Sequence, residues 1–226
     1  MIEQLIQYLE KFVNPNRVEL LNRNLNKRTQ YITIVLEDIF QPHNSSAILR
    51  SCDCFGVQDI HIIENRNKYL PNDEIALGAE QWLTLIKYNN YENNSVAALT
   101  SLKNQGYRII ATTPHNDSEF LTEFDLNKGK CAFVFGTELT GISDSVVNMA
   151  DGFMRIPMHG FTESFNISVS VAIVLYQLTQ KLHNSDLNWH LEKSERLKIK
   201  LKWLRNSIKK PSLIEKHFFE NIYKEP

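Results

Sequence analysis

Hydrophobic residues in the central part of the chain occur in short continuous runs that alternate with helix-like spacing. The runs are rich in Val, Ile and Phe, which is typical of buried strands. Strands are predicted at residues 31–39, 57–64, 108–113, 131–136 and 153–158, and a further short apolar stretch covers residues 83–88. Helices are predicted at residues 42–55 and 94–104, with Gly56 and Gly106 as stop signals. This alternation predicts an α/β fold in which crossover helices join parallel strands.

Three further helices are predicted outside this alternation. The segment that follows Asn166 is apolar on nearly every side in its first turns, which suits a helix buried against a sheet or a partner subunit. The first residues, from about Ile2 to Phe12, place apolar side chains on one helical face, and a basic helix is expected from about Leu191 to Lys209. We therefore expect an α/β domain at residues 29–182, with helical extensions at residues 1–28 and 183–226.

The composition is that of an ordinary globular chain. It has 226 residues, of which 42% are hydrophobic and 23% are charged. No stretch reaches the roughly 18 apolar residues that a membrane span requires, and no secretory signal is visible. The three cysteines Cys52, Cys54 and Cys131 are an odd number, so reduced thiols and a cytoplasmic location are expected. The chain lacks His-Glu-x-x-His and paired Cys-x-x-Cys motifs, so we expect no metal.

The formal net charge of −1 conceals an uneven distribution along the chain. Residues 1–28 hold 5 basic and 3 acidic side chains, residues 181–226 hold 11 and 6, and the part between them holds 9 and 17. Basic ends and an acidic body suggest that the ends contact a polyanion, although solvated helix faces would have the same composition. The candidates for phosphate contacts are Lys11, Arg17, Arg23, Lys27, Arg28, Arg196, Lys200, Lys202 and Arg205.

Several common chemistries lack their motifs in this chain. No G-x-G-x-x-G follows the first predicted strand, and the loop from Gly136 to Gly141 lacks the Gly-Lys-Ser/Thr of a nucleotide-hydrolysing P-loop. No Gly-x-Ser-x-Gly elbow occurs either. What remains is three polar clusters just past the ends of predicted strands, at residues 43–50, 135–141 and 156–166. Open α/β sheets bind ligands at that edge, although each cluster alone could be a helix cap or a tight turn.

In this order, the three clusters resemble the signature motifs of the SpoU/TrmH family of RNA 2′-O-ribose methyltransferases, which belong to the knotted SPOUT class. The matching segments are HNSSAILRSCDCFGV, FVFGTELTGIS and IPMHGFTESFNISVSVA, within a resemblance that runs from about Tyr31 to Gln180. The chain is most similar to the TrmH branch, which methylates the 2′-oxygen of guanosine 18 in the tRNA D-loop. It shares with that branch the basic flanking helices, and no separate amino-terminal RNA-binding domain is expected.

The resemblance implies a parallel sheet with a deep trefoil knot, expected at about residues 131–175, that holds S-adenosylmethionine. By position in the motifs, Thr112, Gly136, Ile156 and Phe165 would line the cofactor pocket. Arg50 matches the catalytic arginine of the family, and the residues that hold it and the RNA would be Asn44, Glu138, Ser164 and Asn166. The implied assembly is a homodimer with the active site at its interface, and the implied partner is tRNA rather than DNA or a membrane.

Two questions stay open at the level of sequence. Arg50 could accept the proton of the ribose hydroxyl, but a guanidinium has so high a pKa that it could instead be a fixed cation, with His43 or water taking the proton. The alternatives for function are 2′-O-methylation of ribosomal RNA or of the tRNA wobble nucleotide, or a non-catalytic RNA-binding protein. The presence of Asn44, Arg50, Glu138, Ser164 and Asn166 together speaks against the last of these.

Overall fold

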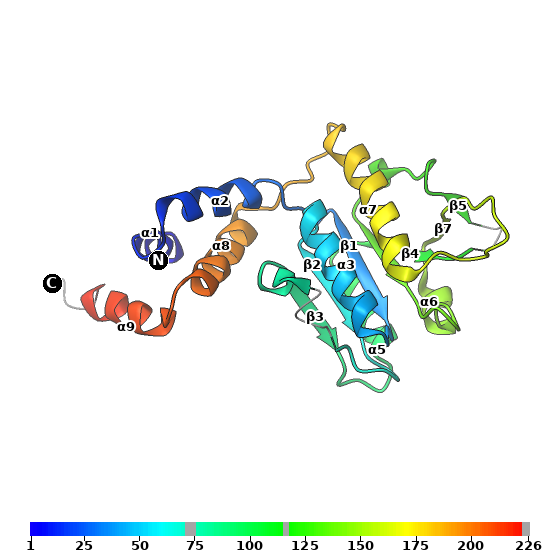
Figure 1. Ribbon diagram of the computed structural model, residues 1–226, viewed down its shortest axis with the longest axis horizontal. Coiled ribbons are helices and arrows are strands. Elements are labelled where there is room, and N and C mark those ends of the chain that lie inside the picture. Colours follow the sequence, from blue (N-terminus) through cyan, green and yellow to red (C-terminus); the bar gives the residue numbers. More distant parts are fainter. Residues whose placement is uncertain (71–75, 115–117, 223–226) are drawn as a thin grey trace. The chain divides into compact units, whose positions relative to one another are not determined.

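The structure of the chain is a computed structural model, which describes residues 1–70, 76–114 and 118–222 (Figure 1). Its residues fall into two compact units. One unit, Thr29–Trp189, contains the sheet, and the other combines residues 1–28 with the carboxyl-terminal residues from His190 onward.

The larger unit is built on a seven-stranded sheet in which every pairing is parallel. The strands are β1 (Ile32–Glu37), β2 (Asp59–Ile63), β3 (Thr84–Tyr88), β4 (Arg108–Thr112), β5 (Glu119–Phe120), β6 (Cys131–Phe135) and β7 (Gly152–Arg155). Their order across the sheet is β3-β2-β1-β6-β4-β7-β5. At its centre, Leu36 lies opposite Ile62 on one side and Phe135 on the other. The predicted α/β fold with parallel strands is confirmed.

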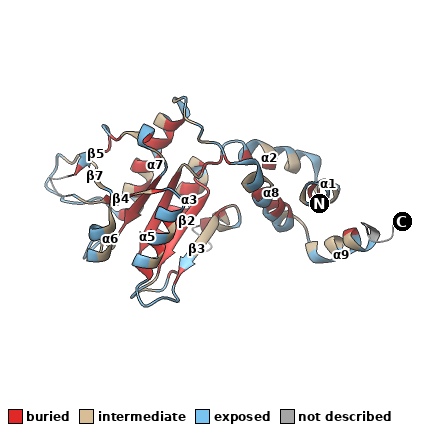
Figure 2. Ribbon diagram, turned by 180° about the vertical axis from the view of Figure 1, so that it is seen from behind, coloured by how far each residue is buried: buried red, intermediate tan, exposed pale blue. Residues whose placement is uncertain are grey.

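Helices cover both faces of the sheet. The helices are α3 (Pro42–Phe55), α5 (Asn94–Asn104), α6 (Asp144–Met149) and α7 (Ile167–His183), and two short 3-10 helices, η1 (Ala79–Gln81) and η2 (Leu126–Lys128), lie in the connections. Leu36 and Phe133 belong to the same hydrophobic cluster as side chains of α3 and α7, whereas Val35 and Val134 pack with α5 and α6. Alternate residues of each strand therefore face different helical layers, and every residue of β1, β2 and β6 is buried (Figure 2).

The smaller unit is entirely helical within the part that the structure describes. It contains α1 (Ile2–Glu10), α2 (Pro15–Leu25), α8 (Lys193–Ser207) and α9 (Pro211–Ile222). The helix α8 contacts both α1 and α2, so the two ends of the chain share one core, with Leu9, Trp203 and Leu204 fully or almost fully buried. In the part of the chain that the structure covers, no helix is both long and apolar enough to cross a bilayer.

Candidate active site

Side chains from all three polar clusters meet at one point. Asn44 lies in the first turns of α3, Glu138 in the loop after β6, and Asn166 at the start of α7. The Nδ2 groups of Asn44 and Asn166 both donate to Glu138 Oε1, at 2.8 and 3.1 Å, and Asn166 Nδ2 also lies 3.1 Å from Asn44 Oδ1. The three residues, called the amide–carboxylate cluster below, connect segments that are 94 and 122 positions apart in the sequence.

Two neighbours fix the orientation of this cluster. Gln41 Oε1 accepts a second hydrogen bond from Asn44 Nδ2, at 3.0 Å. Asn166 is the N-cap of α7, where its Oδ1 accepts from the backbone N–H of Ser168 at 2.9 Å and from its hydroxyl at 2.7 Å. Sequence reasoning did not find Gln41 or Ser168. The helix-start pattern at Asn166 could have indicated Ser168, because an N-cap side chain binds the backbone two or three residues ahead.

The loop that carries Glu138 is a tight turn. Thr137 and Gly141 exchange two backbone hydrogen bonds of 2.9 and 3.0 Å, and Gly141 has a φ of +67°. A Cβ atom at Gly136 would lie 2.1 Å from the carbonyl oxygen of Gly141. No larger residue at position 136 can occupy this turn as it stands, so Gly136 determines the path of the loop.

A cavity of about 740 Å³ lies beside this loop and is called the first cavity below. Thr112, Gly136, Ile156 and Phe165, the four residues expected to line the cofactor pocket, all line it, as do Glu138 and Ser164. The Thr112 hydroxyl donates to the carbonyl oxygen of Val134 at 2.8 Å, so this side chain ties β4 to β6. The volume is within the range of small-molecule and cofactor sites.

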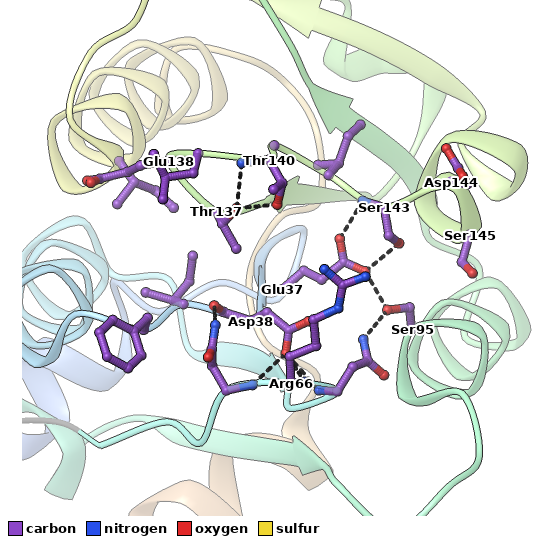
Figure 3. A pocket seen from close by; sticks show the side chains of 18 of the residues that line it. Glu37, Asp38, Arg66, Ser95, Thr137, Glu138, Thr140, Ser143, Asp144 and Ser145 are labelled. Carbon is purple, nitrogen blue, oxygen red and sulfur yellow. Dashed lines mark hydrogen bonds between the residues drawn. The ribbon is translucent and has the colours of Figure 1, made fainter.

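A second cavity, also about 740 Å³, shares the wall formed by residues 137–142 and Ile167 with the first (Figure 3). Asn44 and Glu138 line it together with polar side chains from the ends of β1, β2 and β3. Glu138 therefore lies between the two cavities and contributes to both linings.

Arg50 lies outside both cavities. It is six residues beyond Asn44, about 9 Å further along the helix axis, and its side chain is exposed. His43, Ala47, Arg50 and Cys54 follow helical spacing, and these four form the accessible side of α3. Within the described residues, Arg50 makes no hydrogen bond or ion pair, whereas Asn44 is buried. The structure thus brings Asn44, Glu138 and Asn166 together and leaves Arg50 directed away from them.

The nine basic candidates all lie in the helical unit, in different environments. Lys11, Arg23, Lys27 and Lys202 are exposed. Arg17 is half-buried. Arg28 is buried, with its guanidinium 5.1 Å from the centre of the Trp203 ring. Arg196 bonds to Asn26, Lys200 pairs with Glu10, and Arg205 pairs with Glu215. Among the described residues, no group of His, Cys, Asp and Glu is arranged to hold a metal ion.

Comparisons with known proteins agree with this arrangement. Residues 31–176 match the SpoU rRNA Methylase family. A protein of Borreliella burgdorferi named tRNA (guanosine(18)-2′-O)-methyltransferase is 42% identical over 210 residues, which cover 93% of this chain and 94% of that protein.

Two solved structures resemble the fold. The A. aeolicus TrmH/SpoU tRNA modifying enzyme aligns with a TM-score of 0.76 at 31% identity, over 89% of this chain and 99% of its own. The SpoU methyltransferase AviRb from Streptomyces viridochromogenes, solved in complex with AdoMet, aligns with a TM-score of 0.56 at 17% identity, over 70% of this chain and 60% of its own. The match to the family covers most of the chain and all three polar clusters, and the chain belongs to the SpoU methylase family.

Proposed function

We propose that this chain transfers the methyl group of S-adenosylmethionine to the 2′-oxygen of guanosine 18 in tRNA. The observation that carries the proposal is the amide–carboxylate cluster, which joins three distant sequence motifs at the edge of a cofactor-sized cavity. The choice of guanosine 18 is supported by the B. burgdorferi relative of that name, which aligns over nearly its full length.

The residues of the first cavity fit S-adenosylmethionine. Gly136 lets the loop wall fold tightly against the backbone of Gly141, and Ile156 and Phe165 supply apolar surface for an adenine ring. Phe165 is 40% exposed, which leaves its ring accessible to a ligand. When bound, S-adenosylmethionine supplies a methyl group on a positively charged sulfur. The Thr112 hydroxyl positions this lining by its hydrogen bond to Val134, which ties β4 to β6.

The side chains of the chain itself must orient a ribose hydroxyl and stabilise the charge that develops on its oxygen. Asn44 and Asn166 fix Glu138, and we assign these three residues and Ser164 to positioning the ribose. A guanidinium is a permanent cation with donors in a fixed fork, so we assign to Arg50 the grip on the RNA phosphate and the stabilisation of the alkoxide. The ribose proton then passes to His43 or to water, since His43 lies on the same accessible side of α3.

Because Arg50 does not line the cavities of its own chain, the site is completed by a second copy. The outer face of α7 supports this proposal. Val169, Ile173 and Tyr176 follow helical spacing on it, and Val169 and Tyr176 are 45% and 59% exposed. The Tyr176 ring packs edge to face with Phe55 of α3, at 6.4 Å between centroids. Such an accessible apolar stripe is suited to a homodimer interface.

We also propose that residues 131–175 form the trefoil knot expected for the family. The strand order supports this path, because β6 lies between β1 and β4. The chain then continues to β7 on the other side of β4, and α7 packs on α3.

The helical unit, residues 1–28 and 190–222, is proposed to bind tRNA phosphates through its accessible basic side chains. Lys11, Arg23, Lys27 and Lys202 are exposed, which favours them for this role. Arg28 is buried against Trp203, which favours a part in the helical core. Affinity for tRNA should fall steeply with salt if these contacts are made. A tRNA substrate and unpaired cysteines agree with a cytoplasmic location.

The experiment is methyl transfer from labelled S-adenosylmethionine to an unmodified tRNA transcript, followed by mapping of the methylated ribose. A transcript with adenosine at position 18 is the control. Label at guanosine 18 that is lost with the adenosine transcript supports the proposal. Transfer to the wobble nucleotide or to ribosomal RNA would show that the substrate is that RNA and not guanosine 18. Cofactor binding without transfer to any RNA would favour a non-catalytic RNA-binding protein.

A further inference from the structure

The second cavity opens where four parallel strands end. Glu37 is the last residue of β1, and Asn65, Glu92 and Thr137 follow β2, β3 and β6. This edge is where open α/β sheets bind their ligands. We propose that the second cavity holds the base of the nucleotide that is methylated, and that it selects guanine. The inference rests on the proposed function and assigns a site to its substrate.

The position relative to the first cavity favours a part of the same substrate. Asn44 and Glu138 line the second cavity, and Glu138 also lines the first. If the ribose of a nucleotide lies at Glu138, its base would therefore lie in the second cavity, and the methyl donor would lie in the first. Among the residues that the structure describes, the loop of residues 137–142 and Ile167 line both cavities and form their common wall.

The floor of the second cavity is held in place by its own hydrogen bonds. Glu37 is buried, and its carboxylate accepts from the Ser95 hydroxyl and from the hydroxyl and backbone N–H of Ser143, at 2.7 and 2.8 Å for Ser143. Asn65 Nδ2 donates to Ser95 Oγ at 2.8 Å, which ties the loop after β2 to α5. A site with a fixed floor loses little entropy when a ligand binds.

Asp38 provides an acceptor that the fold leaves unused. Its Oδ1 accepts from the backbone N–H groups of Asn65, Arg66 and Asn67, at 2.7, 2.8 and 3.2 Å. Within the described residues its Oδ2 accepts no hydrogen bond, although the side chain is only 8% exposed and lines the cavity. The φ of Asp38 is +54°, a backbone conformation that costs energy in a residue other than glycine. The carboxylate is thus fixed at the cavity wall with one oxygen available.

Arg66 provides the complementary donors. Its side chain is exposed, it points into the cavity, and it forms no ion pair with any residue in the described part of the chain (Figure 3). A carboxylate and a guanidinium together match guanine. Its N1–H and N2–H₂ groups can both donate to the one available oxygen of Asp38, and its O6 and N7 atoms accept from an arginine. Adenine has only one donor group on its edge, so it would leave the carboxylate poorly paired.

The test compares tRNA transcripts that carry guanosine or inosine at position 18, using the full chain. Inosine lacks only the N2 amino group, so wild-type kcat/KM should be lower for inosine by about tenfold or more. Asp38→Asn keeps an oxygen for the three backbone N–H groups, and it should reduce this ratio to near 1. Arg66→Ala should lower kcat/KM for both transcripts equally, because both bases carry O6 and N7. The controls are Asp186→Asn and Lys128→Ala, which remove one negative and one positive charge at exposed positions outside the cavity. They should change neither kcat/KM nor the guanosine-to-inosine ratio.

The proposed function and the base site can be overturned separately. Wild-type chain that does not methylate the guanosine transcript overturns the proposed function. Wild-type activity, together with an unchanged guanosine-to-inosine ratio in Asp38→Asn, overturns the base site alone. Should Asp38→Asn fail to fold, a transcript with 6-thioguanosine at position 18 can be photocrosslinked to the wild-type chain. Crosslinks are expected within residues 37–41, 64–67 or 92–95, and crosslinks only elsewhere would also overturn the base site.

Discussion

The side-chain amide of Asn166 donates a hydrogen bond of 3.1 Å to the side-chain oxygen of Asn44. Because both amides also donate to Glu138 Oε1, the orientation of each asparagine is determined by the other. The starts of α3 and α7 are thereby linked through side chains at the site, in addition to their packing against each other. Residues that support this pair should affect the rate of transfer without touching the substrate.

Ser168→Ala removes the hydroxyl that donates to Asn166 Oδ1 at 2.7 Å and leaves the backbone cap in place. Loss of one such hydrogen bond weakens the orientation of Asn166 by about 1 kcal/mol, so kcat should fall about fivefold. The KM for S-adenosylmethionine should stay near the wild-type value. Ser51→Ala removes a hydroxyl bond to the helix backbone of α3 and serves as the control. A Ser168→Ala enzyme with wild-type kcat would show that this hydroxyl has no positioning role.

Gly136→Ala should disrupt the wall of the first cavity. The new Cβ would meet the backbone of Gly141 and Ile142 at 2.1 to 2.4 Å, so the loop must move. We expect the affinity for S-adenosylmethionine, measured by calorimetry, to fall by about tenfold or more, because a 1.4 kcal/mol change suffices for a factor of ten. Gly152→Ala is the matched control, since its Cβ would have only an ordinary contact of 3.5 Å with Ile110. Equal cofactor affinities in the two variants would contradict the role of the loop.

Arg50→Ala should abolish methyl transfer and leave cofactor binding nearly intact, because Arg50 lies outside the first cavity. A site shared between two copies makes a further prediction for mixtures. When Arg50→Ala chains are mixed with Glu138→Gln chains and allowed to exchange subunits, each heterodimer regains one complete site. Restored transfer in the mixture supports the shared site. A mixture as inactive as its components, with exchange verified by mass spectrometry, would place Arg50 and Glu138 of one chain in the same site.

Folding stability should depend on pH through His61. This ring is buried and stacks against Tyr88, its Nδ1 lies 3.1 Å from the Tyr88 hydroxyl, and burial lowers its pKa to about 4 from 6.5. Below pH 6.5 the unfolded chain takes up a proton that the folded chain does not. Above pH 6.5, His61 therefore leaves the free energy of unfolding unchanged by pH. As the pH falls from 6.5 toward 4, His61 lowers that free energy by up to about 3 kcal/mol.

This dependence can be measured by urea unfolding between pH 4 and 7.5. His61→Gln should have a lower free energy of unfolding at pH 7.5 and a shallower decline in acid than the wild type. His159→Gln changes an exposed ring and should keep the wild-type slope. A wild-type slope in His61→Gln would assign the acid sensitivity to other groups.

Much of the larger unit could be predicted from local sequence signals. The helix α3 was placed correctly because Gly56, with a φ of +76°, ends it, and the start of α7 was placed by the cap at Asn166. The strand predicted at residues 31–39 ends at Glu37, because Asp38 turns the chain with a positive φ. The two-residue strand β5 lacks a periodic pattern of its own and was not predicted.

The helical unit and the site were less predictable. The basic helix was expected from about Leu191 to Lys209, and α8 covers Lys193–Ser207. It buries Ile199 and Trp203 because it packs against α1 and α2 at the other end of the chain. The helices α2 and α9 were not predicted. Gln41 was missed because its partner is a side chain three residues away that is itself fixed from elsewhere in the fold. Contacts of this kind depend on tertiary structure.

The central claim is that the amide–carboxylate cluster is the site of methyl transfer. Its most direct test measures transfer to the guanosine-18 transcript and S-adenosylmethionine binding side by side, in the wild type and in Asn44→Ala. Asn44 lies outside the first cavity, so cofactor affinity should stay near wild type, whereas kcat should fall about a hundredfold with the loss of a preorganised polar group. A folded Asn44→Ala chain that transfers methyl groups at the wild-type rate would contradict the account.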